Sequence, residues 1–248
     1  RSLKEQGVKA NVPVGIFADK SFEMIIGIIA VLKAGGCYTP IDPEYPQQRI
    51  DFIIKDAGIK VVLLQHKYLD VPFNEVTKID LNSESVYNHN KSDIEIVNTP
   101  DDDAYILYTS GTTGIPKGTP IPHRGVIRLV INNIFLNLNE EDRILLAGAI
   151  VFDATVLELW GTMLNGGSLF IIDKETLLSE AAMEKEMAEH EITSFFTTSA
   201  LFTHFVENRI AIFRTLKNVV VGGDVLSTTH ANRLRAYNPA IKLINAYG

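Results

Sequence analysis

The segment with the clearest chemical potential spans residues 108–118 and reads YTSGTTGIPKG. Its hydroxyl, glycine and cationic residues are Thr109, Ser110, Thr112, Thr113, Gly111, Gly114, Gly118 and Lys117. Glycine lets the backbone reach positive φ and approach a ligand closely, and successive N–H groups in such a turn form an anion-binding concavity. Hydroxyl groups add donors and the lysine adds a positive charge. The segment is therefore predicted to cradle a polyphosphate.

This segment differs from a Walker A loop, which reads G-x-x-x-x-G-K-[ST] and opens directly into a helix. Here Pro116 precedes Lys117, and Gly118-Thr119-Pro120 follows it. The alternative interpretation is a flexible surface turn, because Gly, Ser and Thr are common in loops.

No metal site is predicted in the chain. His190-Glu191 lacks the second histidine of an H-E-x-x-H zinc pair. Asp101-Asp102-Asp103 lacks the spaced ligands and the glycine of a calcium loop. His123 and Cys37 are expected to be structural.

The elements around these residues alternate between short β-rich runs and longer helical patterns. Strands are expected at 12–18, 37–41, 61–65, 104–109, 144–149, 168–172, 192–197, 219–221 and 242–244. Helices are expected at 21–34, 122–136, 155–164, 177–189, 199–207 and 227–236, with another beginning near Pro46. Residues 66–100 are polar and show no sustained period. This order predicts an α/β fold with doubly wound, mostly parallel sheets and helices on both faces.

Two glycine-rich segments follow predicted strands. Residues 109–114 follow the strand at 104–109, and Gly222-Gly223-Asp224 follows the strand at 219–221. Ligands of open α/β sheets bind beyond the carboxyl ends of the strands. Both segments are therefore placed where a binding site is expected, although Gly222-Gly223-Asp224 is also compatible with a plain strand-to-helix turn.

Composition excludes several other classes of protein. The 248-residue chain is 46% hydrophobic and 21% charged, which is typical of a globular protein and unlike a disordered or fibrous one. A net charge of −7 argues against a general nucleic-acid binder, which needs a basic surface. Cys37 is the only cysteine, so no internal disulfide is possible. The longest apolar run, 24–32, is too short to span a bilayer. We expect a cytoplasmic protein without nucleic-acid or membrane partners.

Residues 108–118 resemble the phosphate-binding signature of the adenylate-forming enzymes, which include acyl-CoA synthetases, luciferases and the adenylation domains of nonribosomal peptide synthetases. Three further segments narrow the resemblance. Residues 32–50 (LKAGGCYTPIDPEYPQQRI) resemble the second core motif of amino-acid adenylation domains, 152–169 (FDATVLELWGTMLNGGSL) the fourth, and 245–248 (NAYG) the opening of the fifth. The resemblance runs nearly from end to end and fits the N-terminal half of such a domain.

Enzymes of this family activate a carboxylate, whose oxygen attacks the α-phosphate of ATP while pyrophosphate leaves. The resemblance implies catalytic roles for Lys117, Thr109 and Phe152. It also implies a nucleotide site in which the 109–117 loop holds the departing phosphates and two later segments border the adenine. The residues implied are Thr109, Ser110, Gly111, Thr112, Thr113, Gly114, Lys117, Gly222, Gly223, Asp224, Asn245 and Tyr247. The cofactors implied are ATP and Mg²⁺, with the main protein ligand of the metal expected beyond Gly248.

The resemblance further implies that Asp153 pairs with the α-ammonium group of an amino acid and that Phe152 walls the pocket. A carboxylate in an apolar pocket is costly unless it is paired, and the substrate cation supplies a partner. The alternatives are that Asp153 caps the following helix and that Phe152 packs in the core.

The substrate-binding positions implied by the family are Asp153, Ala154, Leu157, Phe196, Val220, Gly222 and Ala246. Apart from Asp153, these residues are apolar or small. A charged substrate side chain would lie unpaired among them at a considerable cost. The expected substrate is therefore a hydrophobic amino acid.

The resemblance also predicts two subdomains. Residues 1–121 would form an N-terminal α/β subdomain that includes the phosphate-binding loop, and 122–248 a flavodoxin-like α/β subdomain that carries the substrate pocket. The implied partners are the remainder of the adenylation domain and a carrier protein with a phosphopantetheine arm, in nonribosomal peptide synthesis. Without that remainder we expect little activity. The alternatives are an acyl- or aryl-CoA ligase fragment, a non-catalytic nucleotide-binding fragment and an engineered folding unit.

Overall fold

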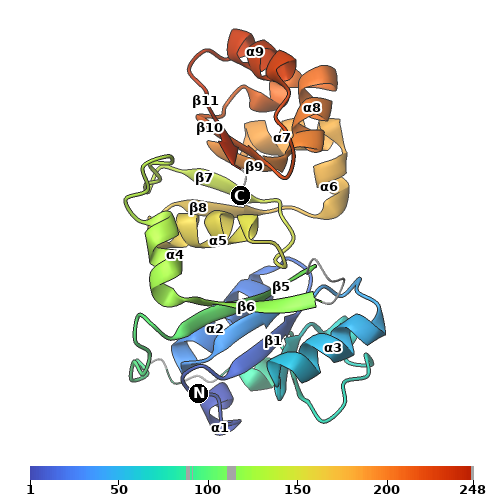
Figure 1. The fold of residues 1–248 in the computed structure, drawn as a ribbon, viewed down its shortest axis with the longest axis vertical. Helices are drawn as coiled ribbons and strands as arrows, with labels where there is room; N and C mark the ends of the chain where they lie inside the picture. Colours follow the sequence, from blue (N-terminus) through green and yellow to red (C-terminus); the bar gives the residue numbers. More distant parts are fainter. Residues whose placement is uncertain (88–89, 91, 111–115, 247–248) are drawn as a thin grey trace. The chain divides into compact units, whose positions relative to one another are not determined.

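The computed structural model describes residues 1–87, 90, 92–110 and 116–246 (Figure 1). The chain divides into two compact units, Arg1–Ile127 and Arg128–Gly248. We call them unit 1 and unit 2. The division lies inside helix α4 (His123–Val130), whereas the sequence analysis placed the boundary after residue 121.

Unit 1 is built on a six-stranded sheet with the order β4-β3-β1-β2-β5-β6. Its strands are β1 (Pro13–Phe17), β2 (Cys37–Pro40), β3 (Val61–Leu64), β4 (Thr77–Asp80), β5 (Asp103–Ser110) and β6 (Pro116–Pro122). Neighbouring strands are parallel except for the antiparallel pair β5–β6. The carboxyl ends of β1, β2, β3 and β5 therefore lie along one edge of the sheet.

Helices cover both faces of this sheet. Helix α2 (Phe22–Ala34) begins at Ser21, whose side chain accepts a hydrogen bond from the Met24 N–H, and ends at Gly35, which has a φ of +103°. Helix α3 (Gln47–Ala57) packs Ile50, Ile53 and Ile54 against Val62 and Leu64 of β3. Gly27 of α2 instead approaches Leu63, so α2 covers the opposite face, because successive strand residues point to opposite sides. Shorter helical segments of this unit are α1 (Ser2–Glu5), His66–Tyr68 and Glu84–Val86.

Unit 2 is built on a five-stranded sheet with the order β11-β10-β9-β7-β8, in which every described pair is parallel. Its strands are β7 (Arg143–Leu146), β8 (Ser168–Ile171), β9 (Ser194–Thr198), β10 (Asn218–Gly222) and β11 (Lys242–Ala246). Its helices are α5 (Ala154–Leu164), α6 (Lys174–Leu178), α7 (Glu180–Glu189), α8 (Ser199–Asn208), α9 (Thr228–Tyr237) and the 3-10 turn Ile210–Phe213. Helix α5 lies on one face, and α8 and α9 lie on the other (Figure 1). The doubly wound α/β prediction is confirmed.

Two predicted helices differ from the structure, and two strands were missed. The helix predicted at 122–136 ends at Val130, because Asn132 has a φ of +50° and the Asn133 side chain accepts hydrogen bonds from the N–H groups of Phe135 and Leu136. The helix predicted at 177–189 is two helices, and Ser179 between them caps α7. Strands β4 and β6 were not predicted at all.

Candidate functional site

The two ends of the predicted phosphate-binding segment lie on the antiparallel strands β5 and β6, and we call this pair of strands the phosphate hairpin. The antiparallel register pairs Thr109 with Lys117 and Tyr108 with Gly118. Directly opposite residues of an antiparallel pair point to the same face. The Thr109 and Lys117 side chains are both exposed and lie on that shared face. Of the other predicted residues, Gly111, Thr112, Thr113 and Gly114 lie outside the described residues, as does the side chain of Ser110.

Tyr108 attaches the phosphate hairpin to helix α3. Its hydroxyl donates a hydrogen bond of 2.7 Å to Oδ2 of Asp56, and its ring meets that of Phe52 edge to face at 6.4 Å. The side chain is only 6% exposed, and burial together with the nearby Asp56 carboxylate raises the pKa of Tyr108 well above its ordinary value. The hairpin base is therefore held through a side chain that the sequence analysis did not single out.

Gly118 is a glycine for a different reason from the one expected. Its φ is not positive. A Cβ at this position would instead lie 2.9 Å from Cζ and 3.0 Å from the hydroxyl oxygen of Tyr108. The absence of a side chain at Gly118 leaves room for the tyrosine ring beside the neighbouring strand.

Unit 2 brings two predicted adenine-binding segments together. The β10–β11 register pairs Gly222 with Ala246 and Val221 with Asn245. A Cβ on Gly222 would lie 2.7 Å from the Ala246 carbonyl oxygen, and Gly223 has a φ of +87°. Both positions therefore require glycine. Tyr247 lies outside the described residues.

The turn at Gly223-Asp224 is anchored to helix α8. Ser199, the first residue of α8, is buried and donates a hydrogen bond of 2.8 Å to the Asp224 carbonyl oxygen. The Asp224 carboxylate accepts from the Val225 N–H at 2.7 Å, and both side chains are exposed. Ser199 carries no sequence signal of its own, since it is one more serine near a helix start.

The predicted substrate positions on the sheet share one of its faces. Phe195, Val219 and Val221 belong to the core under α8 and α9, so the alternating residues Phe196 and Val220 point to the other side. These two residues are paired in register and are 7% and 5% exposed. Helix α5, which carries Ala154 and Leu157, contacts β7 and β8 of the same sheet. The structure thus gathers apolar positions on the α5 side of unit 2.

Phe152 and Asp153 precede α5. Their surroundings contradict the two structural alternatives, in which Phe152 packs in the core and Asp153 caps the helix. Phe152 is 63% exposed, so it is not a core residue of unit 2. Asp153 has helical backbone angles, with φ −64° and ψ −29°, and its side chain makes no capping hydrogen bond. Its exposed carboxylate is therefore not used to begin the helix. Leu157 lies one turn further along and is 8% exposed.

His123 lies at the start of α4 and is part-buried, which lowers its pKa despite the nearby Asp102 and Asp103. Its Nε2 is buried and has no hydrogen-bond partner among the described residues. Across those same residues, no three His, Cys, Asp or Glu side chains gather as a metal site would require. The structural role of His123 stays a prediction.

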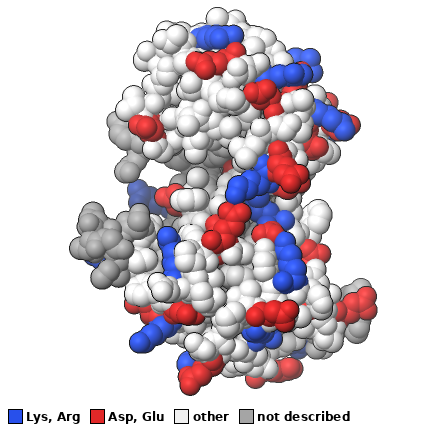
Figure 2. Space-filling model, turned by 90° about the vertical axis from the view of Figure 1, so that its right-hand side faces the viewer, with Lys and Arg blue, Asp and Glu red and all other residues white. Residues whose placement is uncertain are grey.

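On the face drawn in Figure 2, basic and acidic side chains are interspersed rather than gathered into patches of one sign. Within the described part of the chain, no helix is both long and apolar enough to cross a bilayer.

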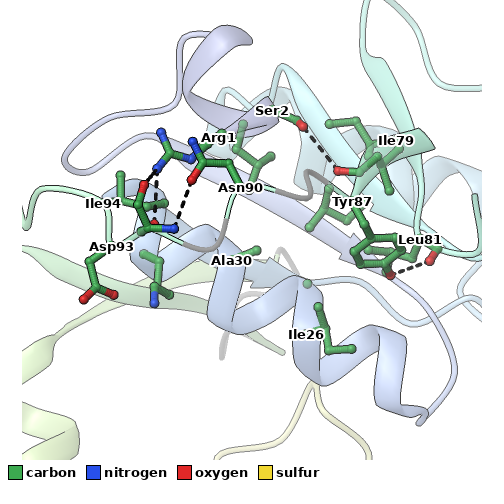
Figure 3. Close-up of a pocket in the computed structure, with 16 residues that line it drawn as sticks. Arg1, Ser2, Ile26, Ala30, Ile79, Leu81, Tyr87, Asn90, Asp93 and Ile94 are labelled. Carbon is green, nitrogen blue, oxygen red and sulfur yellow. Dashed lines mark hydrogen bonds between the residues drawn. The ribbon is translucent and has the colours of Figure 1, made fainter. Parts of the chain in front are cut away.

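A cavity of about 330 Å³ lies within unit 1 (Figure 3). It is lined by Ile26 and Ala30 of α2, by Ile79 of β4 and by Tyr87, whose hydroxyl donates to the Leu81 carbonyl at 2.6 Å. None of the residues that line it belongs to the predicted phosphate, adenine or substrate positions.

Comparison with known proteins gives consistent results. A family model described as AMP-binding enzyme matches residues 1–248. Gramicidin S synthase 2 of Brevibacillus brevis is 40% identical over 248 residues, which cover 100% of this chain but 6% of that protein. The chain therefore spans only a small part of such relatives.

Two solved structures have the same fold as the chain. The nonribosomal peptide synthetase FmoA3, in its alpha-methyl-L-serine-AMP bound form, matches with a TM-score of 0.89 at 28% identity, covering 100% of this chain and 28% of that one. Holo-PA1221, a nonribosomal peptide synthetase protein that contains adenylation and PCP domains and is bound to a vinylsulfonamide inhibitor, matches with a TM-score of 0.87 at 26% identity. That match covers 100% of this chain and 42% of the PA1221 chain.

Proposed function

Because the chain belongs to the AMP-binding enzyme family, we propose that it forms part of an adenylation domain that activates an amino acid. In the proposed reaction, a carboxylate oxygen of the amino acid attacks the α-phosphorus of ATP. The bond between the α-phosphorus and the bridging oxygen breaks, so the products are an aminoacyl-adenylate and pyrophosphate. Such reactions depend on positioning and charge stabilisation more than on a protein nucleophile.

Lys117 and Thr109 are the residues of this chain proposed to stabilise the departing phosphates. Their opposed, exposed positions on the phosphate hairpin present an ammonium group and a hydroxyl on one face. The Gly222–Ala246 pair is the proposed border of the adenine, where the absence of a side chain on Gly222 lets the two strands approach closely. Magnesium would accompany ATP, but the described residues offer no cluster of ligands, and we assign none of them to the metal.

The observation that carries the amino-acid assignment is the exposed carboxylate of Asp153. It does not cap α5, and it stands beside the exposed Phe152 at the α5 side of unit 2. A carboxylate placed next to apolar positions fits a substrate that brings its own cation, such as an α-ammonium group. An acyl or aryl acid has no such group, which argues against the CoA-ligase alternative.

The side chain of the proposed substrate is hydrophobic. Leu157, Phe196 and Val220 supply only apolar surface on this side of unit 2. A charged substrate side chain would lose its hydration there without gaining a partner. The activated amino acid would then pass to the phosphopantetheine thiol of a carrier protein, in line with the adenylation and PCP domains of PA1221.

The test is exchange of labelled pyrophosphate into ATP by the full synthetase that contains this chain. We expect exchange to depend on a hydrophobic amino acid and to be weak with glutamate, lysine or an aryl acid. Asp153→Asn should raise the KM for the amino acid by roughly 10- to 100-fold, since a hydrogen-bonded charge pair is worth about 1.5–3 kcal/mol. Preferential exchange with an aryl acid, unaffected by Asp153→Asn, would instead support the CoA-ligase alternative.

The residues beyond this chain give a second test. The chain alone should exchange little pyrophosphate and should gain activity when the remainder of the domain is supplied. Full activity of the isolated chain would contradict the assignment of the missing functions to that remainder.

A further inference from the structure

Glu158 is a buried carboxylate for which the proposed function has no role. It lies on α5 and is only 1% exposed. Burial of a charged group is expensive unless partners compensate for its lost hydration. The contacts of Glu158 therefore indicate what the residue is for.

One partner is the backbone of the loop between β7 and α5, residues 147–153. Both carboxylate oxygens of Glu158 accept from the Gly148 N–H, at 3.3 Å from Oε1 and 3.1 Å from Oε2. The same loop is held a second time by Thr155, whose hydroxyl donates to the Ala149 carbonyl oxygen at 2.7 Å. Thr155 is 3% exposed. Two buried side chains of α5 thus fix consecutive residues of the loop.

Gly148 shows how closely the loop and helix approach each other. A Cβ there would lie 2.7 Å from Oγ1 of Thr155 and 3.3 Å from Oε2 of Glu158. The first distance is shorter than real contacts allow, so a side chain would push the loop off the helix.

The loop ends in the residues proposed to meet the substrate. The Ala149 carbonyl, which accepts from Thr155, also accepts from the Phe152 N–H at 3.0 Å. The Phe152 carbonyl in turn accepts from the Thr155 N–H at 3.2 Å. A displacement at Gly148 or Ala149 would therefore be transmitted to Phe152 and Asp153.

We propose that Glu158 and Thr155 are positioning residues that hold the 147–153 loop so that Phe152 and Asp153 face the amino acid. This inference rests on the proposed function for its kinetic consequence. Glu158 is too deeply buried to touch the substrate, so it acts only through the loop.

The kinetic experiment uses the full synthetase and compares Glu158→Ala with Glu158→Gln. The alanine variant leaves the Gly148 N–H without its acceptor, whereas the glutamine amide oxygen can still accept from it. We expect Glu158→Ala to lower kcat/KM for the amino acid by up to about 100-fold, as small misplacements of reacting groups do, with little change in the KM for ATP. Glu158→Gln should restore most of the loss.

Thr155 offers a second pair of variants that keep the carboxylate. Thr155→Ser retains the hydroxyl and should preserve amino-acid kinetics, while Thr155→Val should lower kcat/KM for the amino acid. Thr162→Val is the matched control, because Thr162 is buried on the same helix but donates to the Glu158 carbonyl at 2.6 Å rather than to the loop. It should change stability without changing the kinetics of the folded enzyme.

Amide hydrogen exchange of residues 147–153 gives a readout that does not need activity. We expect exchange about tenfold faster in Glu158→Ala and Thr155→Val than in wild type or Thr162→Val, because one hydrogen bond of the loop is lost. Unchanged loop exchange in both variants would overturn the positioning role, as would unchanged amino-acid kinetics in an active enzyme. If the wild-type synthetase does not exchange pyrophosphate into ATP, the proposed function is rejected. The amide hydrogen exchange data would still decide whether Glu158 and Thr155 hold the loop.

Discussion

The phosphate hairpin of unit 1 and the 147–153 loop of unit 2 carry proposed site residues, and they are held in different ways. Thr109 and Lys117 stand on paired strands, so the ladder of the sheet positions them and Tyr108 fixes the hairpin to α3. Phe152 and Asp153 stand on a loop that has no ladder and depends on buried side chains of α5. A motif on strands thus largely positions itself, whereas a motif on a loop needs support from residues outside the motif.

The buried polar residues show the same contrast. Among the described residues, unit 1 buries Thr39 and Gln65, while unit 2 buries Asp142, Thr155, Glu158, Thr162, Thr193, Ser194 and Ser199. Both buried carboxylates, Asp142 and Glu158, are in unit 2. Buried charges must stay paired, so polar substitutions are expected to cost more in unit 2 than in unit 1.

The largest expected effect concerns Lys117 of unit 1. It tests whether this residue is needed for the reaction but not for folding. Lys117 is exposed, so Lys117→Ala should leave the melting temperature nearly unchanged. Loss of one group that stabilises developing charge costs about 2.7–4 kcal/mol, so pyrophosphate exchange by the full synthetase should fall about 100- to 1000-fold. Lys60→Ala, which removes another exposed lysine of unit 1, is the control. A large fall in melting temperature with unchanged activity per folded molecule would make Lys117 structural.

The next effect tests whether Tyr108 holds the phosphate hairpin. Gly118→Ala places a methyl group 2.9 Å from the tyrosine ring, which must move away from Asp56. Such overpacking costs typically 1–3 kcal/mol, measurable as a lower urea midpoint. In a Tyr108→Ala background the cost of Gly118→Ala should largely disappear, as a double-mutant cycle would show. Equal costs in both backgrounds would mean that the glycine serves something other than the ring.

The strands of unit 1 that were not predicted are the two edges of its sheet, β4 and β6. Their sequences, TKID and PKGTPIP, contain few of the apolar residues that indicate a strand. β6 contains Pro116, Pro120 and Pro122, which a central strand would not tolerate but an edge strand does. The buried central strands of both units, with nearly continuous apolar runs, were predicted.

The family of the chain was predictable from its motifs, and the family match confirms that resemblance. The roles of the site residues stay predictions. The supporting residues were not predictable. Asp56 is 52 positions from Tyr108, and Ser199 is 25 positions from Asp224, so only the fold brings each pair together. Glu158 stands inside the 152–169 motif, but nothing in its neighbours says that its carboxylate points to the Gly148 backbone.

An effect of similar size in unit 2 tests the cost of an unpaired buried charge. Thr193 donates to Oδ1 of Asp142 at 2.8 Å and accepts from the Arg143 N–H at 2.9 Å. Thr193→Val removes both contacts and leaves the buried carboxylate short of a donor, so we expect unfolding to become easier by about 1–3 kcal/mol. Urea unfolding followed by tryptophan fluorescence measures the change. An unchanged unfolding free energy would show that Asp142 finds another donor.

Acid should weaken unit 1 through His123. Burial lowers the pKa of His123 below its ordinary value of 6.5, so the unfolded chain takes up a proton at a higher pH than the folded chain. The contribution of neutral His123 to the free energy of unfolding is therefore fully present above about pH 6.5, and it is lost progressively as the pH falls below that value. Melting temperatures of wild type and His123→Gln between pH 8 and pH 5 should show a shallower decline in the variant. Parallel curves would contradict a role for His123 in the acid sensitivity.

The smallest expected effect has the opposite sign and completes the comparison of the two units. The Thr39 hydroxyl on β2 is fully buried, and no hydrogen-bond partner for it appears among the described residues. Thr39→Val keeps the branched shape and removes a polar atom that lost its hydration on folding, so the protein should gain up to about 1 kcal/mol. Urea unfolding of Thr39→Val beside Thr193→Val makes the test direct, because both changes remove one buried threonine hydroxyl. A loss of stability in Thr39→Val as large as that in Thr193→Val would mean that the unit 1 hydroxyl is paired in solution, and the contrast between the two units would not hold.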